Sequence, residues 1–349
     1  MSKQLPRFST CLLFLLLSVT VVSAKRVDDV VVLKNGDRLT GEIKSLGRGE
    51  LRFKASYMAE SVRLDWSKVD RLESKDQYQI YLIDGQLFTD SFELNSWRDE
   101  ADENFTIGLQ QNVMKVNQMM VLRILPVEGT FWRQLEGSID LGFSFTSGND
   151  QYQTTLATTT TYRTGDHSFT AAIDSAFSGQ TKGSRSARNQ FTFDYRKQLL
   201  PKWYAGGLFD VLRSDQQSLD RRISVGGFLG RNILQREDTR LSVFGGVVGT
   251  REKYFESIGQ PETTNADAVI GFDLATFRFS KTDIRSRLAL FPSLTTPGRI
   301  RLQATSDVSF KIVKDLWWGF HLYENFDSKP PIIANKNDLG VSTTLGWKF

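Results

Sequence analysis

The chain contains little cysteine, little histidine and no long hydrophobic run beyond its amino terminus. Cys11 is the only cysteine, and His167 and His321 are the only two histidines in 349 residues. After residue 24 no segment reaches the ~18 uninterrupted apolar residues of a membrane-spanning helix. Because no cysteine follows Cys11, the chain after that residue can form neither a disulfide nor a cysteine-based metal site. The net charge of +4 is small against 44 basic and 40 acidic residues, so it gives no argument for a nucleic-acid partner.

The first 24 residues predict a secretory signal peptide. Lys3 and Arg7 form a basic start, residues 12–22 are largely apolar, and Val22-Ser23-Ala24 is a small-residue cleavage site. The apolar stretch is too short to span a membrane as a helix, and no cysteine follows the cleavage site as it would in a lipoprotein. We therefore expect an exported chain that starts near Lys25 and has no thiol.

Residues 25–97 predict a small β module of SH3-like or Sm-like type. Asn35-Gly36 stands between two apolar runs, which indicates a hairpin because both turn residues must tolerate positive φ. A similar pattern returns at Asp84-Gly85. The module has no histidine, no cysteine and no glycine-rich phosphate loop, so we interpret it as a periplasmic docking surface for another protein or for peptidoglycan. We interpret residues 98–132 as a connector. Whether it also contributes one or two strands that pack on the module stays open.

From residue 133 onward the sequence alternates between apolar and polar positions, as strands with two different faces do. Between Leu135 and Thr146 one face consists of Leu, Gly, Ile, Leu, Phe and Phe, and residues 300–312 alternate in the same way. These segments exceed the usual soluble strand length and suit a tilted bilayer crossing. Turn signals divide the region into about twelve strands. We expect them near residues 134–147, 151–163, 167–178, 188–199, 203–213, 221–234, 239–252, 264–280, 283–293, 299–314, 316–325 and 337–349.

The connections between these strands alternate in length. Short connections, such as residues 200–202 and 281–282, alternate along the chain with mostly longer connections, such as residues 253–263 and 326–336. Outer-membrane barrels have this arrangement, with the short turns in the periplasm. Aromatic residues gather near the short turns, as in an interfacial girdle. They are Tyr162, Trp203, Tyr204, Phe279, Trp317, Trp318, Trp347 and Phe349.

We therefore predict an all-β protein of the outer membrane, an antiparallel transmembrane β-barrel of about twelve strands at residues 133–349 that follows the periplasmic module. A soluble β-sandwich is the alternative. A Lys or Arg that faces lipid at mid-depth costs roughly 2–4 kcal/mol, and the apolar faces of the clearest strands carry no charge. Charged and polar residues on the opposite faces are candidates to line the lumen. They are Glu136, Asp140, Arg301, Asp307, Lys311 and His321.

The last nine residues form an alternating strand that ends on an aromatic carboxy terminus. Such an ending is typical of outer-membrane barrels, where the insertion machinery recognises the last strand. We predict that Leu345, Trp347 and Phe349 are the assembly signal. We also expect this strand to pair with the strand at Leu135 and so close the barrel.

Two segments of the barrel region carry a known pattern. They are Gly142–Asn149 near its start, and Asn337-Asp338, Gly340-Val341 and Leu345–Phe349 at its end. With these residues the segment 133–349 resembles the domain of unknown function 481 family, DUF481, whose members are often labelled salt-induced outer-membrane proteins. The resemblance implies an outer-membrane barrel and implies no reaction.

Two functions stay open. The first is a non-enzymatic barrel, either a narrow channel or a structural element, without a cofactor. Its partners would be outer-membrane lipids, lipopolysaccharide and the barrel-assembly machinery. The alternative is a barrel-type lipid hydrolase, with His321 as the base of a Ser–His arrangement. We expect His321 to be a polar lumen residue instead, and His167 to be a solvated turn residue. Glu252, Glu256 and Glu262 are too irregularly spaced for a metal loop, so we expect a solvated rim there.

Overall fold

The computed structural model describes the chain from residue 29 to residue 348 with gaps. The described residues are 29–47, 49–83, 86–92, 106–108, 113–115, 118–127, 131, 135–146, 151–164, 166–180, 185–200, 202–236, 238–256, 259, 261–279, 281–313, 315–330 and 334–348. The predicted signal peptide, the Asp84-Gly85 turn and Phe349 lie outside the described residues and stay predictions. Within these ranges no helix has the length and apolar character to cross a membrane.

The amino-terminal module is a small β unit that packs around its own core. Its sheet runs in the order β1-β5-β9-β2-β3-β4, with β6 on β5, and β1 also pairs with β2, so β1, β5, β9 and β2 form a ring. Trp66, Phe53 and Ile124 are among its fully buried side chains. The strands are β1 (Asp29–Leu33), β2 (Arg38–Gly47), β3 (Glu50–Lys54), β4 (Val62–Asp65), β5 (Val69–Leu82), β6 (Leu87–Phe92) and β9 (Val121–Pro126), beside a separate pair β7 (Thr106–Gly108) and β8 (Val113–Lys115), and two 3₁₀ turns, η1 (Trp66–Lys68) and η2 (Gln118–Met120).

Strand β9 lies in the segment that we predicted as a connector. It pairs with β5 along Tyr78–Leu82 and with β2 at Leu46. Gln118, just before β9, donates from Nε2 to the carbonyl of Val69 at 3.0 Å. The module therefore takes its last strand from the residues immediately before the barrel.

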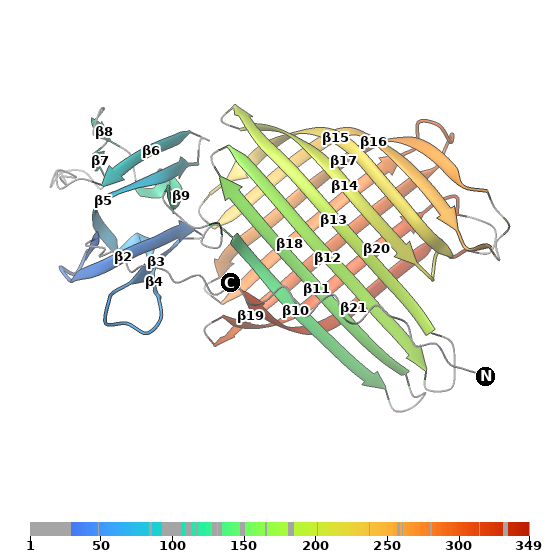
Figure 1. Ribbon diagram of the computed structural model, residues 1–349, viewed down its shortest axis with the longest axis horizontal. Coiled ribbons are helices and arrows are strands. Elements are labelled where there is room, and N and C mark those ends of the chain that lie inside the picture. Colours follow the sequence, from blue (N-terminus) through green and yellow to red (C-terminus); the bar gives the residue numbers. More distant parts are fainter. Residues whose placement is uncertain are drawn as a thin grey trace.

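The remaining described strands close into an antiparallel barrel, which confirms the predicted fold (Figure 1). The barrel strands have 11 to 17 residues, and at a tilt near 40° such strands cross a bilayer core of about 30 Å. They are β10 (Leu135–Thr146), β11 (Gln151–Thr164), β12 (His167–Gln180), β13 (Arg185–Leu200), β14 (Trp203–Ser214), β15 (Leu219–Gln235), β16 (Thr239–Tyr254), β17 (Thr263–Phe279), β18 (Thr282–Pro292), β19 (Ile300–Val313), β20 (Leu316–Asp327) and β21 (Asn337–Lys348).

The outer face of the barrel is apolar. Leu141, Leu229 and Val341 point outward and are more than half exposed. An apolar surface that continues around a whole barrel is far larger than the patches that soluble monomers expose, so it requires a lipid environment. The same strands carry Asp, Arg, Ser and Thr on their inner faces, so the lumen is polar. This is the design of an outer-membrane-type β-barrel.

The barrel closes where its last strand meets its first. Leu345 of β21 lies opposite Leu141 of β10, as expected from the sequence. Among the described residues the β10–β21 register contains five residue pairs, from Ser138–Lys348 to Gly142–Thr344, whereas β10 and β11 share twelve. The seam is therefore short compared with the rest of the wall.

Two aromatic residues that we expected in the girdle face the lumen instead. Tyr204 and Trp317 are buried inside the barrel, while their chain neighbours Trp203 and Trp318 are exposed on its outer face. Adjacent residues on a strand point to opposite faces, so only one member of each pair can contact lipid. The expectation was wrong for Tyr204 and Trp317.

The module sits against the end of the barrel that carries the short connections, called here the turn end; the opposite end is the loop end (Figure 1). Arg123 of β9 donates to Glu136 of β10 at 3.0 Å, and Arg163 of β11 reaches the same carboxylate at 3.2 Å. Arg63 of β4 pairs with Asp315 in the β19–β20 turn. Module and barrel are therefore joined by ion pairs at the turn end.

Candidate functional site

The lumen contains charged side chains that meet across its width. Six of them form the loop-end cluster, defined as Arg222, Glu252, Asp267, Arg299, Arg301 and Asp327. Glu252 is 0% exposed, and it accepts from Arg222 Nε at 2.6 Å and from Arg299 Nη1 at 2.8 Å. Asp327 lies 2.5 Å from Arg299 Nη2, and Asp267 lies 2.5 Å from Arg301 Nη2. Three cations thus meet three carboxylates away from solvent.

Further hydrogen bonds reach two carboxylates of the loop-end cluster. Tyr254 donates its hydroxyl to Glu252 at 3.2 Å, and Thr250 donates to Asp267 at 3.0 Å. Buried ion pairs persist only where attraction and additional hydrogen bonds compensate for the loss of water. Glu252 and Asp327 meet that condition through paired arginines, whereas Asp267 Oδ1 has no hydrogen-bond partner among the described residues. The cluster lies between strands β15, β16, β17, β19 and β20, so it ties distant parts of the wall together.

The connection from β14 to β15 folds over the same end. Gln217 is buried and donates from Nε2 to the carbonyl of Asn325 on β20 at 3.0 Å. Ser214 donates to Asp338 on β21 at 2.5 Å. Ser218 adopts a positive φ of 52°, which non-glycine residues rarely do. A turn held in this conformation by partners across the barrel narrows the loop end further.

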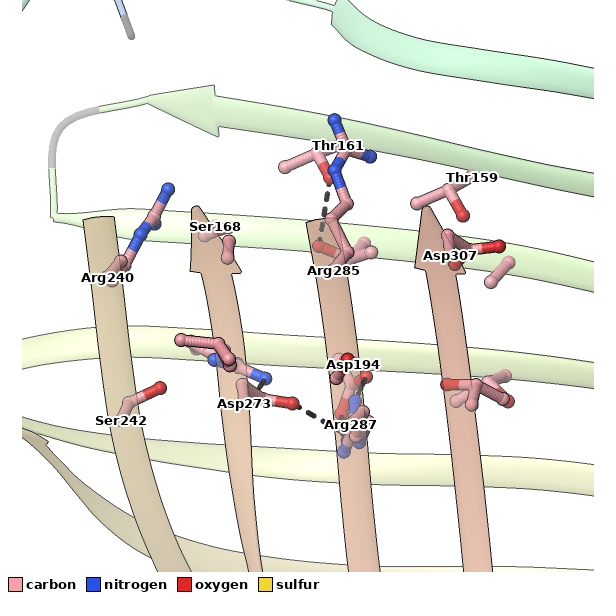
Figure 2. A pocket seen from close by; sticks show the side chains of 18 of the residues that line it. Thr159, Thr161, Ser168, Asp194, Arg240, Ser242, Asp273, Arg285, Arg287 and Asp307 are labelled. Atoms are coloured by element: carbon pink, nitrogen blue, oxygen red, sulfur yellow. Dashed lines mark hydrogen bonds and ion pairs between the residues drawn. The ribbon is translucent and has the colours of Figure 1, made fainter. Parts of the chain in front are cut away.

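Two more groups of charges lie deeper in the lumen. His321 lies between two carboxylates, with Nε2 at 2.6 Å from Asp174 and Nδ1 at 2.7 Å from Asp307. Nearer the turn end, Asp194 of β13 receives Arg287 of β18 at 2.6 Å. Asp273 of β17 receives Arg196 of β13 at 2.8 Å, and these bonds also run across the lumen, as Figure 2 shows for Arg287.

A cavity of about 740 Å³ occupies the part of the lumen that faces the module. We call it the turn-end chamber. Its described lining extends from Arg188 and Asn325 to the turn-end residues Leu200 and Arg236, and it includes Tyr81, Leu87 and other module residues. No member of the loop-end cluster is among these described lining residues. The chamber volume is in the range of small-molecule sites, and module residues stand at its mouth without enclosing it.

The module contributes an aromatic side chain to the chamber. Tyr81 lines it and donates its hydroxyl to Gln79 Oε1 at 3.0 Å. Burial raises the pKa of Tyr81 above its usual value of 10.0. The hydroxyl therefore stays protonated at neutral pH and acts as a hydrogen-bond donor there.

The six predicted lumen residues lie in three different parts of the barrel. Glu136, Asp140, Asp307 and His321 line the turn-end chamber. Arg301 belongs to the loop-end cluster, and Lys311 lies half-buried near the turn end, outside the chamber lining. Leu345 and Trp347 are exposed on the outer face of β21, and their role as the assembly signal stays a prediction.

Of the three acidic residues expected on a solvated rim, two are at the surface and one is inside the lumen. Glu256 and Glu262 are at the surface, and Glu262 forms a bidentate pair with Arg251 at 2.9 Å. Glu252 does not belong to that rim, because β16 continues to Tyr254 and carries Glu252 inward. The expectation was wrong for Glu252. Among the described residues no group of three or more His, Cys, Asp or Glu is arranged to hold a metal ion.

Sequence reasoning missed Arg222, Asp267, Arg299 and Asp327 of the loop-end cluster. The polar-face positions of Arg222 and Asp327 could have been found from the alternation of β15 and β20, whereas Arg299 lies just before β19 and in no strand. The pairing within the cluster could not have been found, because it joins residues up to 105 positions apart through the barrel register.

The family model for "Protein of unknown function, DUF481" matches residues 139–349. No curated protein sequence matches the chain.

Among solved structures, the NanC porin is 11% identical with a TM-score of 0.39, and the match covers 60% of this chain and 98% of the porin. The translocator domain of the autotransporter NalP from Neisseria meningitidis is 13% identical with a TM-score of 0.35, covering 62% and 86%. The beta domain of the Bordetella autotransporter BrkA is 10% identical with a TM-score of 0.30, covering 62% and 98%. With the family model matching well over half of its length, the chain belongs to the DUF481 family of proteins of unknown function.

Proposed function

We propose that the protein is a non-enzymatic outer-membrane barrel whose lumen is shut at the loop end and forms a chamber at the turn end. The observation that carries this proposal is the loop-end cluster, in which Glu252 and Asp327 join arginines from opposite sides of the lumen. A solute that crossed the barrel would have to separate these buried pairs, and removing one partner of such a pair costs roughly 3–5 kcal/mol. The protein in this state is a closed barrel and not an open pore.

The proposal includes an orientation. Outer-membrane barrels place short turns in the periplasm and long loops outside, so the module and the chamber would face the periplasm. This can be tested with a protease added to whole cells. We expect the module to be protected in intact cells and digested after the outer membrane is permeabilised. Digestion in intact cells would contradict the orientation.

The closed state can be tested by conductance. The full chain, folded in detergent and inserted into a planar bilayer, should show no steady current at low voltage. The double variant Glu252→Gln/Asp327→Asn removes both central carboxylate charges without changing side-chain volume, and should raise the frequency of open events. Glu262→Gln, on an exposed ion pair outside the lumen, is the matched control. A steady current through the wild-type protein would contradict the proposal.

The hydrolase alternative finds less support in the site. Both ring nitrogens of His321 face carboxylate oxygens, so neither is directed at a serine hydroxyl as a general base must be. His321 also lies inside the barrel, away from the lipid-facing surface. We expect the His321→Ala variant and the wild-type protein to give the same background rate in a phospholipid hydrolysis assay. A wild-type activity that this variant loses would favour the enzyme.

A further inference from the structure

Arg240 and Arg285 differ from the other arginines that point into the lumen. Arg196 and Arg287 have carboxylate partners inside the barrel. Arg240 and Arg285 both line the turn-end chamber, yet neither forms a hydrogen bond or ion pair within the described residues. Two guanidinium groups that face one cavity without a bonded partner are unusual, because a charge in a confined space favours a counter-charge.

The barrel register places these two arginines in one row. Arg240 of β16 lies opposite Ala275 of β17, and Ala275 lies opposite Arg285 of β18. Neighbouring strands are about 4.8 Å apart, so the two backbone positions are roughly 10 Å apart with a small alanine side chain between them. The row therefore offers a space flanked by two cations.

The next row toward the loop end shows what normally fills such a space. There β17 carries Asp273, with Ser242 of β16 and Arg287 of β18 as lateral neighbours. The Asp273 carboxylate receives Arg196 at 2.8 Å and lies 3.6 Å from Arg287. One pleat further on the same face, the strand has Ala275 in place of a carboxylate. Figure 2 shows Arg240 and Arg285 apart from the paired group of Asp194, Asp273 and Arg287.

The acidic groups around Arg240 and Arg285 are already engaged by other side chains. Glu136 accepts from Arg123 and Arg163, and Asp307 accepts from His321. Asp140 is hydrogen-bonded to Ser138 and lies within electrostatic range of Arg285 and Lys348. The surrounding wall is rich in hydroxyl groups, which can bind the uncharged part of a polar ligand. These groups are Thr159, Thr161, Ser168, Thr170 and Ser242.

We infer that Arg240 and Arg285 form a binding site for an oxyanion group, a phosphate or a carboxylate, carried by a small hydroxyl-rich solute that enters the turn-end chamber. Guanidinium groups bind both carboxylate and phosphate through bidentate hydrogen bonds. The chamber is large enough to hold a sugar ring together with the anionic group. The ligand oxyanion takes the place that a carboxylate side chain at position 275 would occupy. The site depends on the chamber and not on whether the barrel conducts.

The test is a binding titration on the full detergent-folded chain at low salt, with inorganic phosphate, glucuronate and glucose as separate probes. We expect phosphate or glucuronate, or both, to bind with an affinity that falls as salt increases, and glucose alone to bind at least tenfold more weakly. Whichever anion binds more tightly identifies the oxyanion. Glucose that bound as tightly as the anions would overturn the site.

Two variants address the residues directly. Arg240→Gln/Arg285→Gln removes both charges, and Ala275→Asp keeps both charges but supplies an internal carboxylate between them. Each should weaken anion binding by about tenfold or more, because hydrogen bonds to charged groups carry that much affinity. Arg231→Gln is the matched control, since Arg231 stacks on Trp203 away from the lumen, 5.3 Å from its ring. Heat-modifiable migration will show that each variant is folded. Wild-type affinity in the folded Ala275→Asp variant would overturn the inference.

Discussion

The arginines at the two ends of the lumen differ in whether a carboxylate of the protein pairs with them, although the same strands form both ends. At the loop end each arginine of the cluster meets a carboxylate, and Glu252 is fully buried. At the turn end Arg240 and Arg285 face an open chamber and Ala275 stands between them. Where the lumen is closed the protein supplies its own counter-ions, and where it is open the counter-ion can come from outside. Local alternation places the charges, but the register decides which of them are paired.

The largest effect is expected from Glu252→Ala at the loop end. The change leaves Arg222 and Arg299 buried without their central carboxylate. Because an uncompensated buried charge is costly, the free energy of unfolding should fall by roughly 3–5 kcal/mol. Urea unfolding of the barrel in lipid vesicles, followed by tryptophan fluorescence, measures this. The control is Glu262→Ala on the exposed Arg251 pair, which should unfold like the wild type; equal losses in both variants would remove the special role of the loop end.

A smaller effect of opposite sign is expected from Ala275→Asp at the turn end. The new carboxylate would lie between Arg240 and Arg285 and make this row resemble the one at Asp273. Because Arg240 and Arg285 are only half-buried, the gain should be about 1 kcal/mol, as for partly exposed pairs. The same unfolding experiment applies. A clear fall in the free energy of unfolding would mean that other groups already compensate the charges of the two arginines.

A weaker effect again is expected where the module meets the turn end. Asp315→Ala removes the carboxylate that pairs with Arg63 across the junction. The pair is partly exposed, so we expect a loss of roughly 0.2–1 kcal/mol, confined to the module contact. Hydrogen exchange should become faster in β4 and stay unchanged in the loop-end half of β15. Faster exchange throughout the barrel would show that the module and barrel do not behave as separate cooperative units.

The smallest effect is a pH dependence inside the module, remote from both ends of the lumen. Asp29 is 2% exposed, and burial raises the pKa of its carboxyl above 3.8. A raised pKa in the folded state means that the contribution of Asp29 to stability is fully present below about pH 3.8 and is lost as the pH rises through the raised value. Hydrogen exchange of β1, corrected for intrinsic rates, should therefore be slower near pH 4 than near pH 7.

Asp29→Asn provides the control for that pH dependence. The amide cannot ionise, and its oxygen can still accept from the Ile43 amide, which lies 2.8 Å from Asp29 Oδ2 in the wild type. Exchange of β1 in this variant should lose the dependence between pH 4 and pH 7. An unchanged profile would assign the dependence to another group.

The barrel could be predicted from sequence because its signal is local. Each strand alternates between lipid-facing and lumen-facing residues, and the alternation from Leu135 to Thr146 corresponds to a single strand of the structure. The DUF481 pattern led to the same fold. Lumen-facing positions such as Asp307 and His321 follow from the same period of two.

The candidate site could be predicted only in part because its contacts are not local. Asp194 and Arg287 are 93 positions apart, and they meet because β13 and β18 stand on facing walls. No periodicity specifies the stagger that brings them to the same height. We expected Glu252 on a solvated rim because it ends the predicted strand 239–252, whereas β16 continues to Tyr254 and carries Glu252 into the lumen. The module strand β9 gave too short an apolar pattern to be separated from a connector.

The short seam between β10 and β21 has a consequence for assembly kinetics. Every other strand of the wall is added next to its neighbour in the chain, whereas the closing step joins the two chain ends of the barrel through five residue pairs of the described chain. That step must bring together segments about 200 residues apart, so it carries the largest loop-closure entropy and gains few backbone hydrogen bonds in return. We therefore expect closure to be the slowest step of barrel formation and the first to reverse. Because β9 of the module stands directly before β10, a folded module would hold one side of that seam in place while β21 searches for its register.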